Sequence, residues 1–249
     1  MAQQSAKRED ILESLDKLKL TCMKAIYDEA LDYGIKVNMT FPGFLQALLK
    51  EEIKVRKLKS IQTRLRFAQF PETKDLDTFI FKDTPISSEH MLHLYGGEFI
   101  KAARNVVFVG GTGTGKTHLA ISIGMKAVRD GRRVRFFNLV DLANLLEKEK
   151  MDGHSGKVAR HLEKLDLLIL DELGYLPFSK NGGQLVFHLL SKIHQKVSLM
   201  ITTNLTFSEW VSIFADKKMT TALLDRICHQ CDIVETGNES YRLKKRNQP

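Results

Sequence analysis

The sequence is short of cysteine and has no long apolar run. It contains three cysteines, an odd number, which argues against a disulfide framework and fits a reducing cytoplasm. No stretch of about 18 apolar residues occurs, so we expect no membrane span. The N-terminal residues also lack the apolar core of a signal peptide. These absences indicate a cytoplasmic protein.

Acidic residues are outnumbered by basic ones. Lys and Arg total 38 against 30 Asp and Glu, a formal net charge of +8. This excess favours a polyanionic partner, and nucleic acid is the expected one. At 249 residues, 43% of them hydrophobic, the chain is long enough for one α/β domain and a small second one.

The most informative stretch is a glycine-rich loop between a strand pattern and a helix pattern. An apolar, β-branched run occupies 106–109, and 118–125 has helical character. The loop between them is Gly110, Gly111, Thr112, Gly113, Thr114, Gly115, Lys116, Thr117. A G-x-x-x-x-G-K-T match in the order strand, loop, helix predicts a phosphate-binding loop for a nucleoside triphosphate.

Each residue type of the loop has a predicted role in holding ATP. Glycines let the backbone turn tightly and direct N–H groups at phosphate oxygens. Lys116 is expected to reach the β- and γ-phosphates, and the Thr117 hydroxyl to ligate Mg²⁺. His118 opens the following helix, whose positive dipole end faces the phosphates, and we include it among the nucleotide-binding residues.

Polar residues end two further strand patterns. The apolar run 165–170 leads into Asp171 and Glu172, as in a buried parallel strand with carboxylates at its tip. We expect Asp171 to hold Mg²⁺ through water and Glu172 to polarise the attacking water. Asn204 follows the run 197–203 and is positioned to touch the γ-phosphate. The alternatives are acids that cap the next helix and an asparagine that merely ends a strand.

The N-terminal third is predicted to be helical. Apolar spacing over 9–33 indicates one amphipathic helix, or two broken near 20–22, and a further helix begins near 40. We expect a helical domain with its linker over 1–82, and the ATPase domain over 83–249. Phe79 and Phe81 in the linker alternate as in a short strand or an anchor onto the ATPase core.

A cationic stretch lies inside this N-terminal third. It covers 54–59 and continues with Arg64 and Arg66. It is either a helix laid along a DNA backbone or a solvated helix face, because Glu51 and Glu52 can pair with their neighbours. Backbone contacts alone would give no sequence specificity.

The C-terminal third offers an arginine and a cysteine pair. A helical pattern over 219–227 carries Arg226, and 231–234 is a candidate last strand. Cys228 and Cys231 do not make a zinc site, because the remaining cysteine is remote and four ligands are needed.

Several of these motifs together resemble the IstB-type transposition helper ATPases. The segments that carry the resemblance are 113–120, 170–177, 201–205, 224–226 and 240–242. The resemblance implies an AAA+ P-loop fold of the helicase-loader and initiator clade, with a parallel sheet sandwiched by helices and a small all-α N-terminal domain. It also implies ATP-driven self-assembly on double-stranded DNA and delivery of that DNA to a partner transposase.

The same resemblance assigns roles to single residues. Asn204 is similar to the sensor-1 residue, Arg226 to the arginine finger that reaches a neighbouring subunit's γ-phosphate, and Arg242 to a sensor-2 residue. Members often have proline after the first loop glycine, where this chain has Gly111. We therefore expect a slightly looser loop that still binds ATP.

Two other functions compete with the helper. A replicative helicase loader of the DnaC type shares the core and differs in its protein partner. A small-molecule P-loop kinase would need a substrate pocket and acceptor-dependent turnover. The segment 171–177 and the basic stretch favour the helper.

Overall fold

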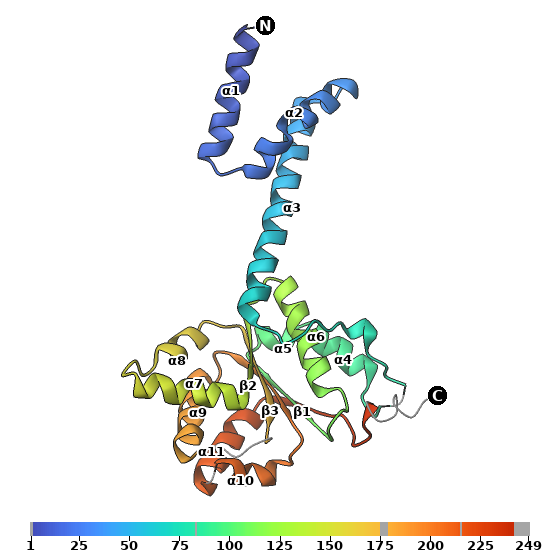
Figure 1. The fold of residues 1–249 in the computed structure, drawn as a ribbon. Helices are drawn as coiled ribbons and strands as arrows, with labels where there is room; N and C mark the ends of the chain where they lie inside the picture. Colours follow the sequence, from blue (N-terminus) through green and yellow to red (C-terminus); the bar gives the residue numbers. More distant parts are fainter. Residues whose placement is uncertain (1, 83, 175–178, 215, 242–249) are drawn as a thin grey trace. The chain divides into compact units, whose positions relative to one another are not determined.

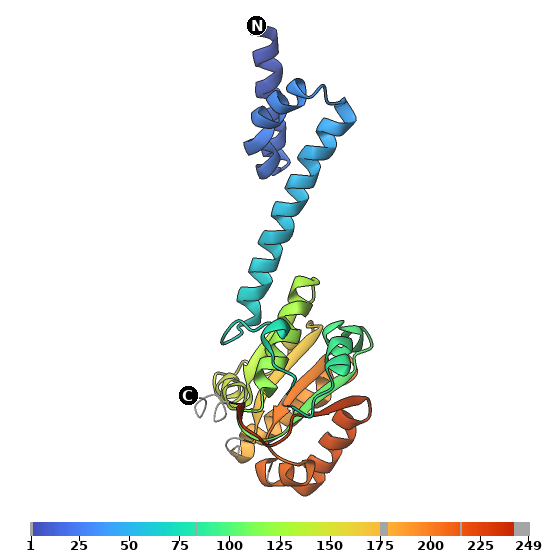
Figure 2. The same cartoon turned by 90° about the vertical axis from the view of Figure 1, so that its right-hand side faces the viewer.

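The computed structural model describes residues 2–82, 84–174, 179–214 and 216–241. By its internal contacts the chain divides into two compact units, 1–63 and 64–249. Figures 1 and 2 show the elements of both units. The division falls within the long helix α3 (Phe41–Ala68). None of the described helices is long and apolar enough to cross a membrane.

The N-terminal unit is helical, as predicted. It contains α1 (Ala2–Lys17), α2 (Thr21–Lys36) and the first part of α3. The break expected near 20–22 is confirmed. Its buried apolar core is small and consists of Leu15, Met23, Tyr27 and Leu48.

A buried carboxylate joins two helices of this unit. Glu52 on α3 is 4% exposed and accepts hydrogen bonds from the backbone N–H groups of Cys22 (2.8 Å) and Met23 (3.0 Å). These N–H groups lie in the first turn of α2, where no intrahelical acceptor exists for them. Arg56 donates to Glu52 (2.8 Å) and to the Lys19 carbonyl (2.7 Å). Part of the cationic stretch is therefore occupied with holding this unit together.

The larger unit is built on a parallel sheet with the order β2-β3-β4-β1-β5. Every neighbouring pair is parallel, which confirms the predicted fold class. The strands are β1 (Asn105–Val109), β2 (Val134–Asn138), β3 (Leu167–Leu173), β4 (Ser198–Thr203) and β5 (Cys231–Glu235). The carboxyl ends of parallel strands meet at one edge, where a ligand of such a sheet binds.

Helices cover both faces of the sheet (Figure 1). Side chains alternate along the strands, so Val106 and Phe108 face one core while Val107 faces the other. The first core is covered by α4 (Ser88–Tyr95), α5 (Glu98–Lys101) and α6 (Lys116–Arg129). The second is covered by α7 (Leu139–Met151), α8 (Lys157–Leu162), α9 (Lys180–Ile193), η2 (Phe207–Glu209), α10 (Trp210–Phe214) and α11 (Lys217–Cys228).

The segment from 64 to 82 packs against the sheet unit. Ala68 and Leu76 are buried in the first core, and Phe79 and Phe81 pack on it. Phe79 follows the short helix η1 (Leu76–Thr78), so the anchor, and not the short strand, is the alternative observed. The predicted boundary places this segment with the N-terminal domain and its linker, over 1–82, whereas by its contacts it belongs to the larger unit.

Candidate nucleotide-binding site

The phosphate loop joins β1 to α6 at the carboxyl edge of the sheet. Gly115 has φ +96°, and a Cβ there would lie 2.5 Å from the Phe79 ring. Gly113 has φ +80°, and its Cβ would lie 2.4 Å from the Ser240 hydroxyl oxygen. Positive φ and this crowding both require glycine at these two positions.

The segment after β5 supports the loop from outside. The Thr114 hydroxyl donates to the Gly111 carbonyl (2.9 Å) and lies 2.6 Å from the Thr236 hydroxyl. We expected Gly111 to loosen the loop, but its N–H donates to the Gly237 carbonyl at 2.8 Å. Proline could not make this hydrogen bond, so glycine here ties the loop to the rest of the unit.

Lys116 lies over the loop that it follows. Its ammonium donates to the carbonyls of Gly110 (2.8 Å) and Gly111 (2.7 Å). Burial lowers the pKa of Lys116, and the charges of Asp171 and Glu172 oppose that shift. A triphosphate would offer the ammonium stronger, charged acceptors than these carbonyls.

Asp171 on β3 faces the first turn of α6. Its carboxylate accepts from the Thr117 hydroxyl at 2.9 Å and from the Thr202 hydroxyl on β4. Burial raises the pKa of Asp171, and the hydrogen bonds from the two hydroxyls offset only part of this increase. A hydroxyl and a carboxylate that lie this close together offer the oxygen ligands that Mg²⁺ prefers. The side chains present therefore fit the predicted metal.

Glu172 is exposed, unlike its neighbour Asp171. Its φ of +62° is unusual for a non-glycine residue, and the β3–β4 register is irregular between Leu170 and Leu173. The Glu172 carboxylate accepts from the Asn138 side-chain amide at 2.7 Å. Asn138 also caps α7, because its side-chain oxygen accepts from the Val140 N–H at 3.0 Å.

A cleft of about 330 Å³ connects these groups. It is lined by the loop from Gly113 onward, by Asp171 and Glu172, and by Thr78, Phe79 and Ile80 of the 64–82 segment. His118 also lines it, with Nε2 2.9 Å from the Asp75 carbonyl oxygen. The structure thus places residues of the phosphate loop, the two acids and His118 around one cleft.

Asn204 and Arg226 lie elsewhere. Asn204 is the exposed residue directly after β4, which runs between β1 and β3, but it is not part of the cleft lining. Arg226 on α11 donates to the Ser191 hydroxyl and lies 5.4 Å over the Phe187 ring. It shares a small hollow with Asn105 at the start of β1, whereas the loop follows the end of that strand. Arg242 lies outside the described residues.

Sequence reasoning missed two residues that contact the acids. Thr202 donates to Asp171, and its hydroxyl also accepts from the Glu172 N–H at 3.0 Å. Asn138, which contacts Glu172, is the last residue of its strand. A polar residue closing a strand was the available signal for Asn138, as it was for Asn204. Thr202 gave none, because threonine is common inside strands.

Comparison with known proteins agrees with this geometry. The family model described as IstB-like ATP binding protein matches residues 13–249. The ATP-binding protein of insertion sequence IS5376 from Geobacillus stearothermophilus is 35% identical over 240 residues, covering 96% of each chain. That of insertion sequence IS21 from Pseudomonas aeruginosa is 35% identical over 233 residues, covering 93% of this chain and 88% of its own.

Solved structures show the same fold at lower identity. The DnaC helicase loader matches with TM-score 0.54 and 19% identity, covering 65% of this chain and 95% of that one. AMPPCP-bound DnaA from Aquifex aeolicus matches with TM-score 0.54 and 18% identity, covering 65% and 49%. The fold of the larger unit is thus that of an AAA+ P-loop ATPase. Because the family model matches residues 13–249 of the 249 in the chain, the chain belongs to the IstB-like ATP-binding family and is an ATPase.

Proposed function

We propose that this chain is an ATP-dependent DNA-binding helper of a transposase, which assembles on double-stranded target DNA and regulates transposition. The observation that carries the proposal is the family match together with the Thr117–Asp171 contact across the phosphate loop. The relatives named above are ATP-binding proteins of insertion sequences, which supports a role in transposition. The net charge of +8 supports a DNA partner.

In this proposal the cleft residues carry out ATP hydrolysis. The loop N–H groups and Lys116 bind the phosphates, and Thr117 and Asp171 would hold Mg²⁺. When bound, that ion would neutralise developing charge on the phosphate oxygens. Glu172 orients and polarises the attacking water. From outside the cleft lining, Asn204 at the end of β4 would assist at the γ-phosphate. The Asn138 amide donates to one of the two Glu172 carboxylate oxygens, and we infer that this contact restrains Glu172 before it acts on the water.

The position of Arg226 supports assembly of several subunits. Arg226 lies near the start of β1, while the phosphate loop follows its end. Arg226 can therefore serve a γ-phosphate only if that phosphate is bound to another subunit. We infer homo-oligomers in which ATP bridges adjacent subunits, with Arg226 acting across the interface.

Exposed cations of α3 are the proposed DNA contacts. Lys57 and Lys59 are exposed, and within the described part of the chain neither takes part in a salt bridge. Lys54 is also exposed, 3.4 Å from Glu51. Contacts of this kind neutralise phosphates without reading bases.

A size measurement tests the proposal directly. The full chain is sedimented with duplex DNA, with and without a non-hydrolysable ATP analogue. We expect large DNA-bound assemblies only with the analogue, and the same assemblies with ATP for Glu172→Gln, which should bind ATP and turn it over at least about a hundredfold more slowly. A particle of single-subunit size under all conditions would contradict ATP-bridged assembly.

Mixed subunits test the role of Arg226. Arg226→Ala and Lys116→Ala are each expected to be inactive alone. Blending them should restore hydrolysis, because an intact Arg226 then faces an intact phosphate loop. Absence of restored activity would argue against action across an interface.

Recovery of a replicative helicase and no transposase in pull-downs would favour the helicase-loader alternative.

A further inference from the structure

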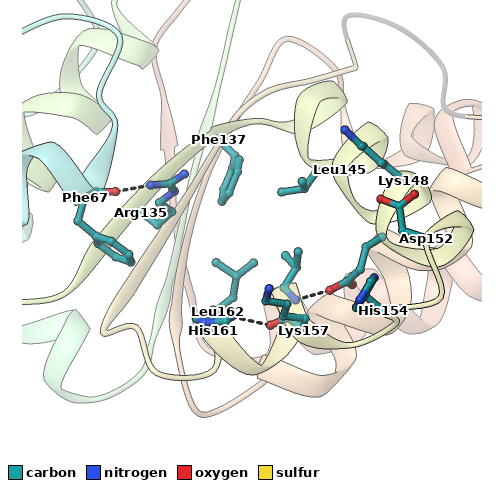
Figure 3. A pocket seen from close by; sticks show the side chains of 12 residues that line it. Phe67, Arg135, Phe137, Leu145, Lys148, Asp152, His154, Lys157, His161 and Leu162 are labelled. Atoms are coloured by element: carbon teal, nitrogen blue, oxygen red, sulfur yellow. Dashed lines mark hydrogen bonds between the residues drawn. The ribbon is translucent and has the colours of Figure 1, made fainter.

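A second hollow, larger than the nucleotide cleft, lies beside the edge strand β2. It has a volume of about 490 Å³ and is formed by β2, α7, α8, the loop between these helices and the end of α3. Figure 3 shows its side chains. Its apolar lining, called here the apolar groove, is Phe67, Phe137, Leu145, Val158 and Leu162. None of the residues that line it also lines the nucleotide cleft.

The apolar groove is open to solvent. Phe67 is 48% exposed and Leu145 is 39% exposed. Leu145 lies on the outer side of α7, whose neighbouring Leu142 and Leu146 are buried in the core. Met151, at the end of the same helix, is 85% exposed. Large apolar side chains gathered on one hollow commonly mark a binding surface.

Arg135 forms one wall of this groove, and its guanidinium already contacts other residues of this chain. Its guanidinium lies 5.4 Å from the Phe67 ring centre and 5.0 Å from that of Phe137. It donates to the Phe67 carbonyl and to the side chain of Gln69, the first contact being drawn in Figure 3. Burial lowers the pKa of Arg135. The wall is therefore fixed in place by the end of α3.

The rim of the groove carries free positive charge. Lys148 and Lys157 are exposed and line the hollow, and no salt bridge within the described ranges involves either. Glu149 also lines the hollow, and its two oxygens accept from the Gly156 N–H (3.1 Å) and the Val158 N–H (2.6 Å). The other acid of the lining is Asp152. The charged side chains of the lining are thus three cations, Arg135, Lys148 and Lys157, and two acids. The two exposed lysines without an ion-pair partner in the described ranges favour a ligand that carries carboxylates.

We propose that the apolar groove binds a short segment of another protein, one that places apolar side chains next to carboxylates. The apolar side chains would bury against Phe137 and Leu145, and the carboxylates would meet Lys148 and Lys157. A nucleic acid backbone suits this surface less well, because phosphates gain nothing from an apolar floor. Apolar anchors within a charged rim are the usual anatomy of such a protein interface.

The test selects peptides on the full chain. A random 12-residue peptide library displayed on phage is enriched on the immobilised protein, and the selected peptides are resynthesised with a fluorescent label. We expect them to combine aromatic or aliphatic residues with Asp or Glu. Leu145→Glu should weaken their binding at least about tenfold, while Leu92→Glu, at a 62% exposed position of α4, should not.

Charge variants separate the rim from general electrostatics. Lys148→Glu and Lys157→Glu should each weaken binding several-fold and make it less sensitive to salt. Lys150→Glu changes the same charge on the same helix outside the groove lining and should have no such effect. All variants should retain the helical circular dichroism and the ATP turnover of the parent chain, since none lies in the nucleotide cleft.

Four results of the peptide experiments would overturn the proposal. They are failure to enrich any peptide, peptides without acidic residues, binding that Leu145→Glu leaves unchanged, and displacement of bound peptide by oligothymidylate that itself requires Leu145. A peptide-free change in sedimentation caused by Leu145→Glu would assign the groove to a second copy of this chain instead.

Discussion

The two units of this chain hold their structure in different ways. In the larger unit the central strands β1, β3 and β4 are buried almost completely between two apolar cores. The N-terminal unit buries few apolar side chains and exposes many, Phe41 at 92% among them. The other strongly exposed ones are Leu18, Tyr33, Ile35, Leu45, Ile53 and Leu58.

The larger unit can therefore position its site residues rigidly, whereas the N-terminal unit is marginally stable. The cores of the larger unit fix the strand ends, so that Thr117, Asp171 and Glu172 meet with defined geometry. The N-terminal unit depends instead on polar contacts, chiefly those of Glu52 with the start of α2. Loss of one such contact should destabilise the N-terminal unit more than a similar loss would destabilise the larger unit, because the apolar core of the N-terminal unit is small.

The largest effect is expected at the phosphate loop. Lys116→Ala removes the ammonium that would leave the Gly110 and Gly111 carbonyls for the phosphates. We expect ATP affinity to fall by a hundredfold or more, measured by titration calorimetry, with the unfolding midpoint little changed. Lys126→Ala, on the same helix but paired with Asp130, should bind ATP normally. Unchanged affinity for Lys116→Ala would remove the loop from the proposed role.

The fold of the larger unit could be predicted from the sequence because the patterns that indicate it are local. The strand 106–109, the loop and the helix after it follow one another directly, and the fold keeps that order. Asp171 and Glu172 likewise end their own apolar run. Parallel pairing then brings these tips to one edge without further information.

The contacts that sequence reasoning could not supply join distant segments. Asn138 reaches Glu172 across 34 positions, and Glu52 reaches the start of α2 across 30 and 29. Their partners depend on strand order and helix packing, which no local pattern encodes. The groove beside α8 was also unforeseen, because its lining joins this helix to β2, α7 and Phe67 of α3, which are distant from it in the sequence.

The next effect tests the N-terminal unit. Glu52→Ala leaves two first-turn N–H groups without their acceptor and should lower the stability of this unit by about 1–3 kcal/mol. The single tryptophan, Trp210, lies in the larger unit. Urea unfolding should therefore shift when followed by circular dichroism and stay in place when followed by Trp210 fluorescence. Glu51→Ala, an exposed neighbour, is the matched control.

The same carboxylate gives this unit a dependence on pH. Burial alone would raise the pKa of Glu52, but hydrogen bonds from Met23, Arg56 and Cys22 outweigh it and hold the pKa below the usual value. The unfolded chain thus binds the proton more tightly, and the stabilisation is complete above the ordinary pKa of 4.5. It should be lost as pH falls through the folded-state value. Glu52→Ala should show a weaker loss over that range, and an identical acid profile would contradict this account.

A smaller effect is expected where Asn138 holds Glu172. Asn138→Ser keeps an oxygen that can cap α7 but is too short to reach the Glu172 carboxylate. Because Glu172 would then be free to orient water, ATP turnover without DNA should rise several-fold in a phosphate-release assay. Ser179→Ala removes a cap from α9 without touching Glu172, and serves as the control for cap loss. Slower turnover in Asn138→Ser would show that the amide assists hydrolysis instead of restraining the base.

The smallest effect distinguishes two adjacent cations of α3. Lys57 is exposed and has no ion-pair partner in the described part of the chain, whereas the Arg56 guanidinium is bonded to Glu52 and the Lys19 carbonyl. If α3 lies along DNA, Lys57→Ala should weaken duplex binding a few-fold and reduce the salt slope by about one. Arg56→Ala should leave that slope nearly unchanged and instead lower the stability of the N-terminal unit. Fluorescence anisotropy with labelled duplex at several salt concentrations measures the first quantity, and urea unfolding the second. Equal slopes for both variants would mean that Arg56 leaves Glu52 to contact DNA. In that case DNA binding would break a polar contact that stabilises the N-terminal unit.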